Sequence, residues 1–382
     1  MTILSLISSE GYYGVENMLV ALAQQLTQQG CRVIVGVFCN SRYPHTEVAD
    51  QARRNGLEVE IIECSGRWDF SVVGKLRGVM AKYGVDVVHP HGYKADLYAL
   101  AAASGNRAAL LATSHNWPSK KLSMRAYAVI DRMALRKFAK VIVVSEVVAG
   151  MLRKAGVAKE KIEFIANGVD LKRFHNAAPK LRSELALGNA PVVGFVGRLV
   201  SDKGGAFLIQ AAKEVLTAHP AAKFVLVGGG PALEEWKALA GELGIGDRVI
   251  FAGAREDMPE VYASFDVAVL PSLVEALPMC LLEAMASAKP VIATNIGAIP
   301  KVVQHEQTGL LLEPGDVKAL AAAIKKLLGD RELAKQLAEN GREHVARNYS
   351  AAAMAAAYIQ KYTEVLASRG QRGYKQPAWE TN

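Results

Sequence analysis

Short runs of apolar residues alternate with longer segments of helical periodicity along most of the chain. The first run covers residues 3–7, and a helical pattern follows at 15–28. Valine, isoleucine and leucine fill adjacent positions in these runs, which is typical of parallel strands buried on both faces. We expect strands at 3–7, 33–38, 59–62, 85–89, 110–113, 141–145 and 162–166, and then at 192–196, 223–227, 249–252, 267–270, 291–294 and 310–312.

A break between the two series of strands separates two domains. Over 174–190 the apolar periodicity is interrupted by polar residues, glycines and a proline. Strands that alternate with helices predict βαβ units, so each series predicts a Rossmann-like α/β domain. We expect an N-terminal domain over 1–176 and a C-terminal domain over 190–350, with a helix at about 351–368 returning to the first domain. Ligands bind at the carboxyl ends of such strands, and two facing sheets predict a cleft between the domains.

The composition agrees with this organisation. The 382 residues correspond to two domains at ~100–200 residues each. Apolar residues make up 51% and charged residues 21%, as in a globular protein. No uncharged apolar stretch is long enough to span a membrane, and the N-terminus has no pattern of a secretory signal. Four scattered cysteines predict buried thiols in a reducing compartment, so we expect a cytoplasmic protein.

The net charge of +8 lies entirely in the N-terminal half. Residues 1–176 carry 23 Lys and Arg against 15 Asp and Glu, whereas residues 177–382 carry 22 of each kind. Such an asymmetry predicts that the N-terminal half meets something anionic.

One segment of that half, 121–140, has a helical pattern with a cationic stripe. At 100° per residue, five cations share an arc of about 100°; they are Lys121, Arg125, Arg132, Arg136 and Lys140. A solvated helix face would show the same pattern. Together with the charge asymmetry, the stripe predicts contact with an anionic membrane surface, with the protein peripheral on the inner face of the membrane.

Several well-known catalytic motifs are absent. The stretch that begins at Gly228 comes nearest to Gly-x-Gly-x-x-Gly but lacks the third glycine, which argues against an NAD-dependent dehydrogenase. There is no Gly-x4-Gly-Lys-Ser/Thr, no Asp-x-Asp and no helical His-Glu-x-x-His. Metal catalysis therefore has no evident ligand set.

The loop after the first predicted strand is the first positive signal. It contains Gly11 and Gly14, and glycines let the backbone approach a ligand. The helix that follows would favour an anion at its N-terminus. An ordinary glycine turn has the same composition, so this segment alone leaves both interpretations open.

A second signal follows the strand at 192–196. Arg198 and Lys203 lie five residues apart at the carboxyl end of that strand. Two such cations would suit a diphosphate, to which arginine makes bidentate contacts. A solvated loop with surface charges is the alternative, and the position at a strand end favours the diphosphate.

A third signal is a pair of glutamates after the strand at 267–270. Glu275 and Glu283 have seven residues between them. A helix that begins near Pro278 would leave Glu275 in the loop and carry Glu283 among apolar residues. A buried carboxylate needs a partner. The partner would be either the hydroxyl pair of a ligand or an internal Arg or Lys.

Together these segments resemble the retaining GT-B nucleotide-sugar glycosyltransferases of the large family-four type, most strongly over 167–313. Glu275 and Glu283 match the Glu-x7-Glu motif of that family, and Gly197-Arg198-Leu199 with Lys203-Gly204 matches its diphosphate clamp. Further matches are Asn167-Gly168-Val169-Asp170 and Thr308-Gly309-Leu310-Leu311. The sequence departs from the family where Tyr13-Gly14 replaces two adjacent glycines, and where Glu-Ala-Leu-Pro replaces Glu-Gly-Phe-Gly.

The resemblance implies a role for each matched residue. Arg198 and Lys203 would neutralise the diphosphate leaving group, so that no metal is needed. Glu283 would hold the ribose hydroxyls, and Glu275 the donor sugar. Backbone groups near Leu277, Pro278 and Met279 would also bind the donor sugar, and His115 would be a catalytic residue near it. Arg255 would border the base, and Gly14 would lie at the phosphates. The residues expected on the acceptor side are Tyr13, His91 and Asp96.

The resemblance also implies the reaction. A hexosyl group would move from a nucleoside-diphosphate sugar, most commonly a UDP-sugar, to a hydroxyl of a glycan or lipid-linked acceptor, with retention of configuration. The process would be the synthesis of a cell-surface polysaccharide or glycolipid, with neither a metal nor nucleic acid as a partner. The alternatives are an inverting GT-B transferase, a sugar-nucleotide 2-epimerase, and a sugar-binding homologue without turnover.

Overall fold

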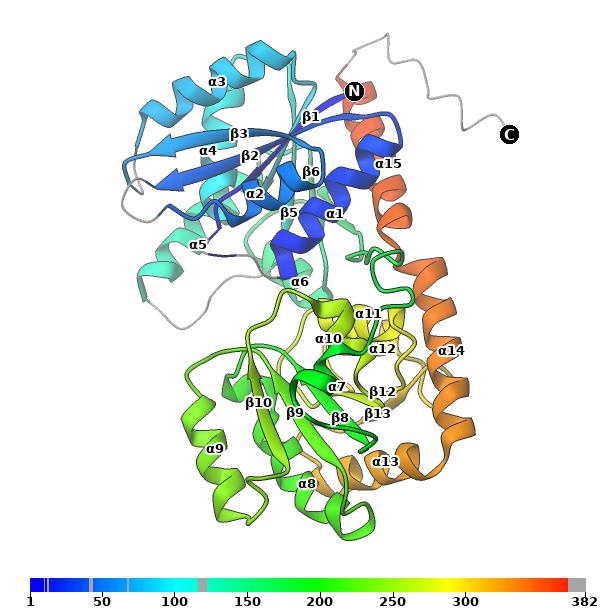
Figure 1. Cartoon of the computed structure of the whole chain (residues 1–382). Coiled ribbons are helices and arrows are strands. Elements are labelled where there is room, and N and C mark those ends of the chain that lie inside the picture. Colours follow the sequence, from blue (N-terminus) through cyan, green and yellow to red (C-terminus); the bar gives the residue numbers. More distant parts are fainter. Residues whose placement is uncertain (10, 12–13, 41–43, 67–68, 116–121, 370–382) are drawn as a thin grey trace, which may run out of the picture. The chain divides into compact units, whose positions relative to one another are not determined.

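The chain folds into two compact units, Met1–Gly168 with Ala351–Asn382, and Val169–Ser350. The computed structural model describes residues 1–9, 11, 14–40, 44–66, 69–115 and 122–369, apart from the side chains of 122–128 (Figure 1). The first unit ends at Gly168, earlier than the boundary expected at 176, and it includes the last helix of the chain.

A parallel sheet forms the centre of the N-terminal unit, with the strand order β3-β2-β1-β4-β5-β6-β7 among the described residues. The order reverses between β1 and β4, which makes the carboxyl ends of those two strands the switch point of the sheet. The strands are β1 (Thr2–Ile7), β2 (Arg32–Asn40), β3 (Glu58–Cys64), β4 (Val87–His91), β5 (Ala109–Ser114), β6 (Lys140–Val143) and β7 (Ile162–Phe164).

Helices connect these strands and cover the sheet. In Figure 1 the last helix, α15, runs beside α1, and the two are in contact. The helices are α1 (Gly14–Gln28), α2 (Glu47–Arg54), α3 (Ser71–Tyr83), α4 (Tyr93–Ala103), α5 (Leu122–Leu135), α6 (Glu146–Lys154), the short 3-10 helix η1 (Lys159–Lys161) and α15 (Ala351–Ser368).

The C-terminal unit repeats this plan with the strand order β10-β9-β8-β11-β12-β13, so its switch point lies between β8 and β11. Its strands are β8 (Val192–Val196), β9 (Lys223–Val227), β10 (Val249–Gly253), β11 (Val267–Leu270), β12 (Val291–Thr294) and β13 (Leu310–Leu312). Its helices are α7 (Lys180–Glu184), η2 (Ser201–Lys203), α8 (Gly205–Ala218), α9 (Leu233–Glu242), α10 (Met258–Ala263), α11 (Met279–Ala286), α12 (Ile299–Val302), α13 (Val317–Gly329) and α14 (Arg331–Asn348).

The prediction of two Rossmann-like α/β domains is confirmed. Each unit has its own buried apolar core, built from the strands and from the helix faces turned toward them. Continuous apolar runs become strands here because helices cover both faces of a parallel sheet. The break at 174–190 contains the short helix α7, which the sequence pattern did not indicate. Its anchor is the single fully buried side chain of Leu181.

Candidate active site

Two loops of the C-terminal unit meet at the switch point of its sheet. The backbone N–H of Leu273, after β11, donates to the carbonyl oxygen of Asp202 in η2 at 2.8 Å. Gly204 ends η2 with a φ of 70°, and a Cβ atom there would lie 1.9 Å from the carbonyl oxygen of Pro271. Glycine is therefore required for this approach, because it accepts the left-handed conformation and adds no Cβ atom.

This approach brings Lys203 and Glu275 into contact. The Lys203 Nζ pairs with Oε1 of Glu275, and the hydroxyl of Ser272 donates to the same oxygen at 3.0 Å. The Glu275 side chain is 8% exposed and that of Lys203 is 21% exposed. An ammonium carries three donors, so Lys203 can hold Glu275 and still donate to a phosphate oxygen. Arg198, on the same loop, is exposed.

The glycine-rich loop after β9 supports the loop that carries Arg198. The backbone N–H of Leu199 donates to the carbonyl oxygen of Gly229 at 2.9 Å. Gly228 has a φ of 139°, and a Cβ atom there would lie 1.9 Å from the carbonyl oxygen of Gly197. In the sequence these glycines resemble only an incomplete dinucleotide motif. Because these glycines follow a predicted strand, they could have been predicted to support the neighbouring loop that carries Arg198.

The helix α11 begins directly after Pro278, as predicted, and carries Glu283 into the interior. Glu283 is 6% exposed, and its Oε2 accepts a hydrogen bond from the hydroxyl of Tyr262 at 3.0 Å. Burial, together with the neighbouring Glu283, raises the pKa of Tyr262 well above its usual range. A tyrosine hydroxyl was not among the partners expected for Glu283.

The loop between Pro271 and α11 positions the backbone groups expected at the donor sugar. Leu277 and Pro278 are buried, and Met279 is half-buried at the start of α11. Pro278 has no N–H, so amide donors in this stretch come from its neighbours. The carbonyl oxygen of Ala276 accepts from the N–H of Ala298 at 2.9 Å, which ties the loop to the segment after β12.

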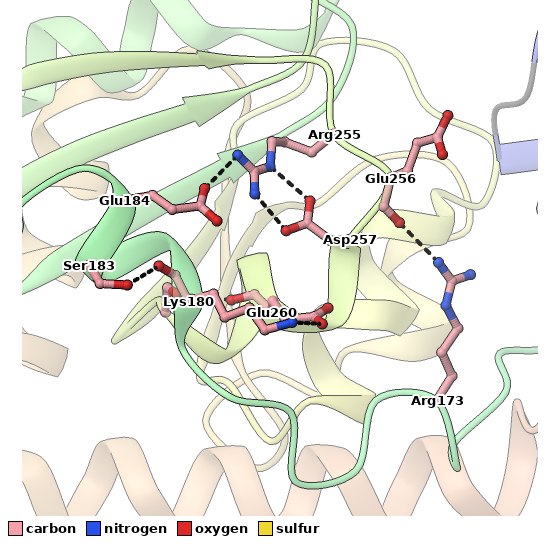
Figure 2. A network of polar contacts seen from close by, with 9 residues as sticks. Arg173, Lys180, Ser183, Glu184, Arg255, Glu256, Asp257 and Glu260 are labelled. Carbon is pink, nitrogen blue, oxygen red and sulfur yellow. Dashed lines mark hydrogen bonds and ion pairs between the residues drawn. The ribbon is translucent and has the colours of Figure 1, made fainter.

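Arg255 lies in an ion-pair network rather than alone (Figure 2). Its Nε donates to Asp257 at 2.8 Å, and its Nη1 pairs with Glu184 of α7 at 2.8 Å. Hydrogen bonds to Asp257 and Glu184 raise the pKa of the guanidinium. A second ion pair, between Lys180 and Glu260, joins α7 to α10. Two carboxylates therefore already hold the guanidinium of Arg255 within the C-terminal unit.

In the N-terminal unit, His91 and His115 lie together at the ends of β4 and β5. Nδ1 of His91 and Nε2 of His115 are 3.2 Å apart. Burial lowers the pKa of His115 to about 4 and that of His91 well below its usual range, so both imidazoles are neutral near pH 7. Gly14 is the first residue of α1. Tyr13 lies outside the described residues.

Asp96, expected on the acceptor side like His91, is in the first turn of α4. Asp96 is 2% exposed and His91 is 4% exposed, so the fold encloses both side chains. Burial, and the carboxylate of Asp131 nearby, raise the pKa of Asp96 well above its usual range. The raised pKa favours the protonated, neutral form of Asp96 beside Asp131.

Comparison with known proteins identifies the family. The model for Glycosyltransferase Family 4 matches residues 12–173, and the model for Glycosyl transferases group 1 matches residues 178–344. The D-inositol 3-phosphate glycosyltransferase of Corynebacterium efficiens is 30% identical over 311 residues, which are 75% of this chain and 73% of that protein. The chain belongs to the group 1 glycosyltransferases.

Two further proteins are similar to this glycosyltransferase. The GDP-mannose-dependent alpha-(1-6)-phosphatidylinositol monomannoside mannosyltransferase of Mycobacterium tuberculosis is 38% identical over 196 residues. That alignment spans 48% of this chain and about half, 51%, of the mannosyltransferase. Among solved structures, Anabaena HepE in complex with UDP-glucose matches with a TM-score of 0.81 and 25% identity, over 96% of this chain and all of that chain. The match supports the GT-B fold.

The prediction of one cationic helix over 121–140 is wrong for this glycosyltransferase. The helix α5 ends at Leu135, and Lys140 is the first residue of β6. Between them Phe138 is fully buried, which forces the chain to turn inward. The helical periodicity continued past the end of the helix because the turn and the strand happen to carry cations at similar intervals.

The cations of the predicted stripe therefore do not share one face. The Nε of Arg136 donates to the carbonyl oxygen of Ala155 at 2.8 Å, and Lys140 pairs with Glu163 at 2.6 Å. Arg132 is half-buried. Lys121 and the side chain of Arg125 lie outside the described residues.

No helix in the described part of the glycosyltransferase is long and apolar enough to cross a membrane. Within the same residues, no three His, Cys, Asp or Glu side chains are grouped as a metal site would need. That the reaction needs no metal stays a prediction, which the activity in a chelator would test.

Proposed function

We propose that this glycosyltransferase moves a hexosyl group from a nucleoside-diphosphate sugar to a hydroxyl of a glycan or lipid-linked acceptor, with retention of configuration. The contact between Lys203 and Glu275 carries the proposal. It places a cation suited to phosphate oxygens beside a carboxylate suited to sugar hydroxyls, at the switch point where α/β sheets bind ligands.

The proposed mechanism centres on the bond between the sugar and the diphosphate. As that bond breaks, negative charge grows on the diphosphate, and fixed cations at Lys203 and Arg198 stabilise it without a metal. A diphosphate oxygen accepts the proton of the attacking hydroxyl. Glu275 holds the sugar, and Glu283 holds the ribose hydroxyls.

The N-terminal unit is assigned two parts of this reaction. Gly14 opens α1 directly after the first loop, where backbone groups would meet phosphates. His115 follows β5 as a neutral imidazole that can donate or accept one hydrogen bond to the donor sugar. Neutrality suits this role because a neutral ring does not compete with the cations for the diphosphate.

The names of similar proteins suggest which donors to test first. One relative is named as GDP-mannose-dependent, and the HepE structure was solved with UDP-glucose. Purified protein should therefore be incubated with UDP-glucose and GDP-mannose, with and without a glycosyl acceptor. Release of the nucleoside diphosphate measures turnover, and NMR of the anomeric proton of the product distinguishes retention from inversion. A donor epimerised without acceptor would indicate a 2-epimerase, and donor binding without turnover a non-catalytic homologue.

Replacing Lys203 with methionine tests the diphosphate assignment. The kcat should fall by more than the acceptor KM rises, because charge grows on the diphosphate only as the bond breaks. Lys325→Met is a matched control, since Lys325 pairs with Glu214 elsewhere in the same unit at 2.7 Å. Activity should persist in EDTA. Full dependence on added Mg²⁺ or Mn²⁺ would contradict the metal-free mechanism.

We also propose that the N-terminal unit rests on an anionic membrane surface. Val129, Ile130 and Met133 form an apolar face on α5 and are 53%, 41% and 55% exposed. Residues three and four apart share one side of a helix. Arg136 and Lys137 are exposed just beyond its C-terminal end. Apolar side chains beside cations are typical of helices that lie in the interface of a bilayer.

Co-sedimentation with liposomes tests the membrane surface. Wild-type protein should sediment with vesicles that contain anionic lipid at low salt, and less at moderate salt. Met133→Glu should reduce binding, because it places a like charge and a polar group against the bilayer. Phe70→Glu is the control, since Phe70 is 81% exposed on the same unit but outside α5. Equal recovery in the supernatant with neutral and anionic vesicles would leave a soluble acceptor as the better proposal.

A further inference from the structure

A buried polar chain runs from the last helix to the centre of the N-terminal sheet. The hydroxyl of Tyr362 on α15 lies 2.7 Å from Nδ1 of His89, and Nε2 of His89 lies 2.7 Å from the hydroxyl of Thr113. The hydroxyl of Tyr358 lies 2.8 Å from the same Thr113 oxygen. Both nitrogens of His89 thus have partners, and its ring is held rigidly inside the unit.

His91 lies between this rigid ring and His115. The ring centroids of His89 and His91 are 4.1 Å apart, and those of His91 and His115 are 5.6 Å apart. Nδ1 of His91 bonds to Nε2 of His115 at 3.2 Å. Its other nitrogen, Nε2, is buried and has no hydrogen-bond partner among the described residues.

The unpartnered nitrogen argues against a purely structural role for His91. A buried polar atom without a partner costs stability, and an apolar side chain at this position would avoid that cost. Among the described residues, the one hydrogen bond of the His91 side chain is the bond to His115. A polar side chain that is kept in the core at a cost in stability is best explained by the hydrogen bond that it makes there.

We propose that His91 is a positioning residue that fixes the ring of His115 and keeps the proton of His115 on Nδ1. The inference rests on the proposed function for the role of His115 in the reaction. The juxtaposition of the two rings does not depend on it.

The direction of the bond follows from counting protons. Each neutral imidazole carries one N–H, and only one of the two facing nitrogens can hold a proton. If His115 donated, His91 would carry its own proton on Nε2, where it would be a buried N–H without an acceptor. Orphaned buried N–H groups are rarer in proteins than under-satisfied acceptors. His91 therefore donates through Nδ1, and His115 keeps its proton on the nitrogen that faces away from His91.

Two variants of His91 with nearly the same size separate the effect of its hydrogen bond to His115 from the effect of its packing. His91→Asn retains a donor near the position of Nδ1, whereas His91→Leu has a similar shape without any polar group. His91→Gln, whose amide lies further along the side chain, replaces the leucine variant if that one fails to fold. Unfolding temperatures of all variants report their effect on packing separately.

Nitrogen-15 NMR of the labelled imidazoles reads the tautomer directly, without any substrate. The signals of His115 are assigned by their loss in His115→Gln. We expect the Nδ1–H form in the wild type and in His91→Asn, and a mixture of both forms in His91→Leu. An unchanged His115 tautomer in His91→Leu, or an Nε2–H form in the wild type, would overturn the inference.

Kinetics then test positioning with UDP-glucose or GDP-mannose, whichever the wild type turns over. His91→Leu should lower kcat about five- to tenfold, which corresponds to one hydrogen bond, with KM changed less than about twofold. His91→Asn should recover most of the loss. Equal kcat values in the leucine and wild-type proteins would overturn positioning. If the wild type turns over neither donor, the proposed function fails while the NMR result still decides the link between the two histidines.

Discussion

Replacing Glu283 with glutamine separates a ligand-binding carboxylate from a structural one. The side chain is 6% exposed and accepts a hydrogen bond from Tyr262 at 3.0 Å. Glutamine has nearly the same size, and its amide oxygen can still accept from the tyrosine. The substitution removes the charge and one acceptor, the features that a pair of ribose hydroxyls would use.

The expected magnitudes differ between the two roles. A hydrogen bond to a charged group contributes ~1–3 kcal/mol, so the Kd for UDP should rise by about 5- to 150-fold if Glu283 holds the ribose. Without ligand the change should be below ~1 kcal/mol, because the bond to Tyr262 survives. For a unit of this size that corresponds to a shift in Tm of less than roughly 2–4 °C.

Calorimetric titration with UDP and with 2′-deoxy-UDP measures the effect. Removing the 2′-hydroxyl should weaken binding to the wild type but change little in Glu283→Gln, because the two changes would remove the same contact. Tyr262→Phe is the companion variant. It removes the hydroxyl that donates to the buried carboxylate and should lower stability by ~1–3 kcal/mol. A large drop in Tm for Glu283→Gln with an unchanged Kd for UDP would refute the ribose assignment and support a structural role.

Two more predictions concern the backbone and the histidines. Gly204→Ala should lower Tm by several degrees and weaken UDP binding, because the added Cβ atom would lie 1.9 Å from the carbonyl oxygen of Pro271. Gly229→Ala is the control and should change Tm little, because no atom lies near the added Cβ. Burial lowers the pKa of His89 to about 3 and that of His115 to about 4, against about 6.5 in an unfolded chain. Below pH 6.5 these two histidines bind protons in the unfolded chain but stay neutral in the native state. The free energy of unfolding therefore falls as the pH drops toward 4. Melting curves at pH 7.5 and pH 5 should show this loss, and a smaller one in His115→Gln.

The strands and the broad architecture could be predicted from the sequence because they depend on local patterns. The bounds of β8, β9, β11, β12 and β13 coincide with the predicted runs. A continuous apolar run between polar loops is legible from neighbouring residues alone. The same holds for the start of α11, which a single proline marks.

The end of α5 could not be predicted in this way. Cations at suitable intervals continued the helical pattern to Lys140, although the helix ends at Leu135. What ended it was the burial of Phe138 in the core of the N-terminal unit. Periodicity indicates which side of a segment is polar. It does not indicate where the next large side chain is buried in the core, and here that position sets the end of the helix.

The partners of the site residues were decided by the tertiary structure alone. Glu283 meets Tyr262, 21 residues away in the chain, and His91 meets His115, 24 residues away. The sequence indicated that Glu283 needs a partner and that the strand ends gather polar groups. It did not indicate which ones touch, because that depends on strand order, register and side-chain packing. In the register of β4 and β5, His91 stands beside Thr113, and this pairing brings His115 within reach.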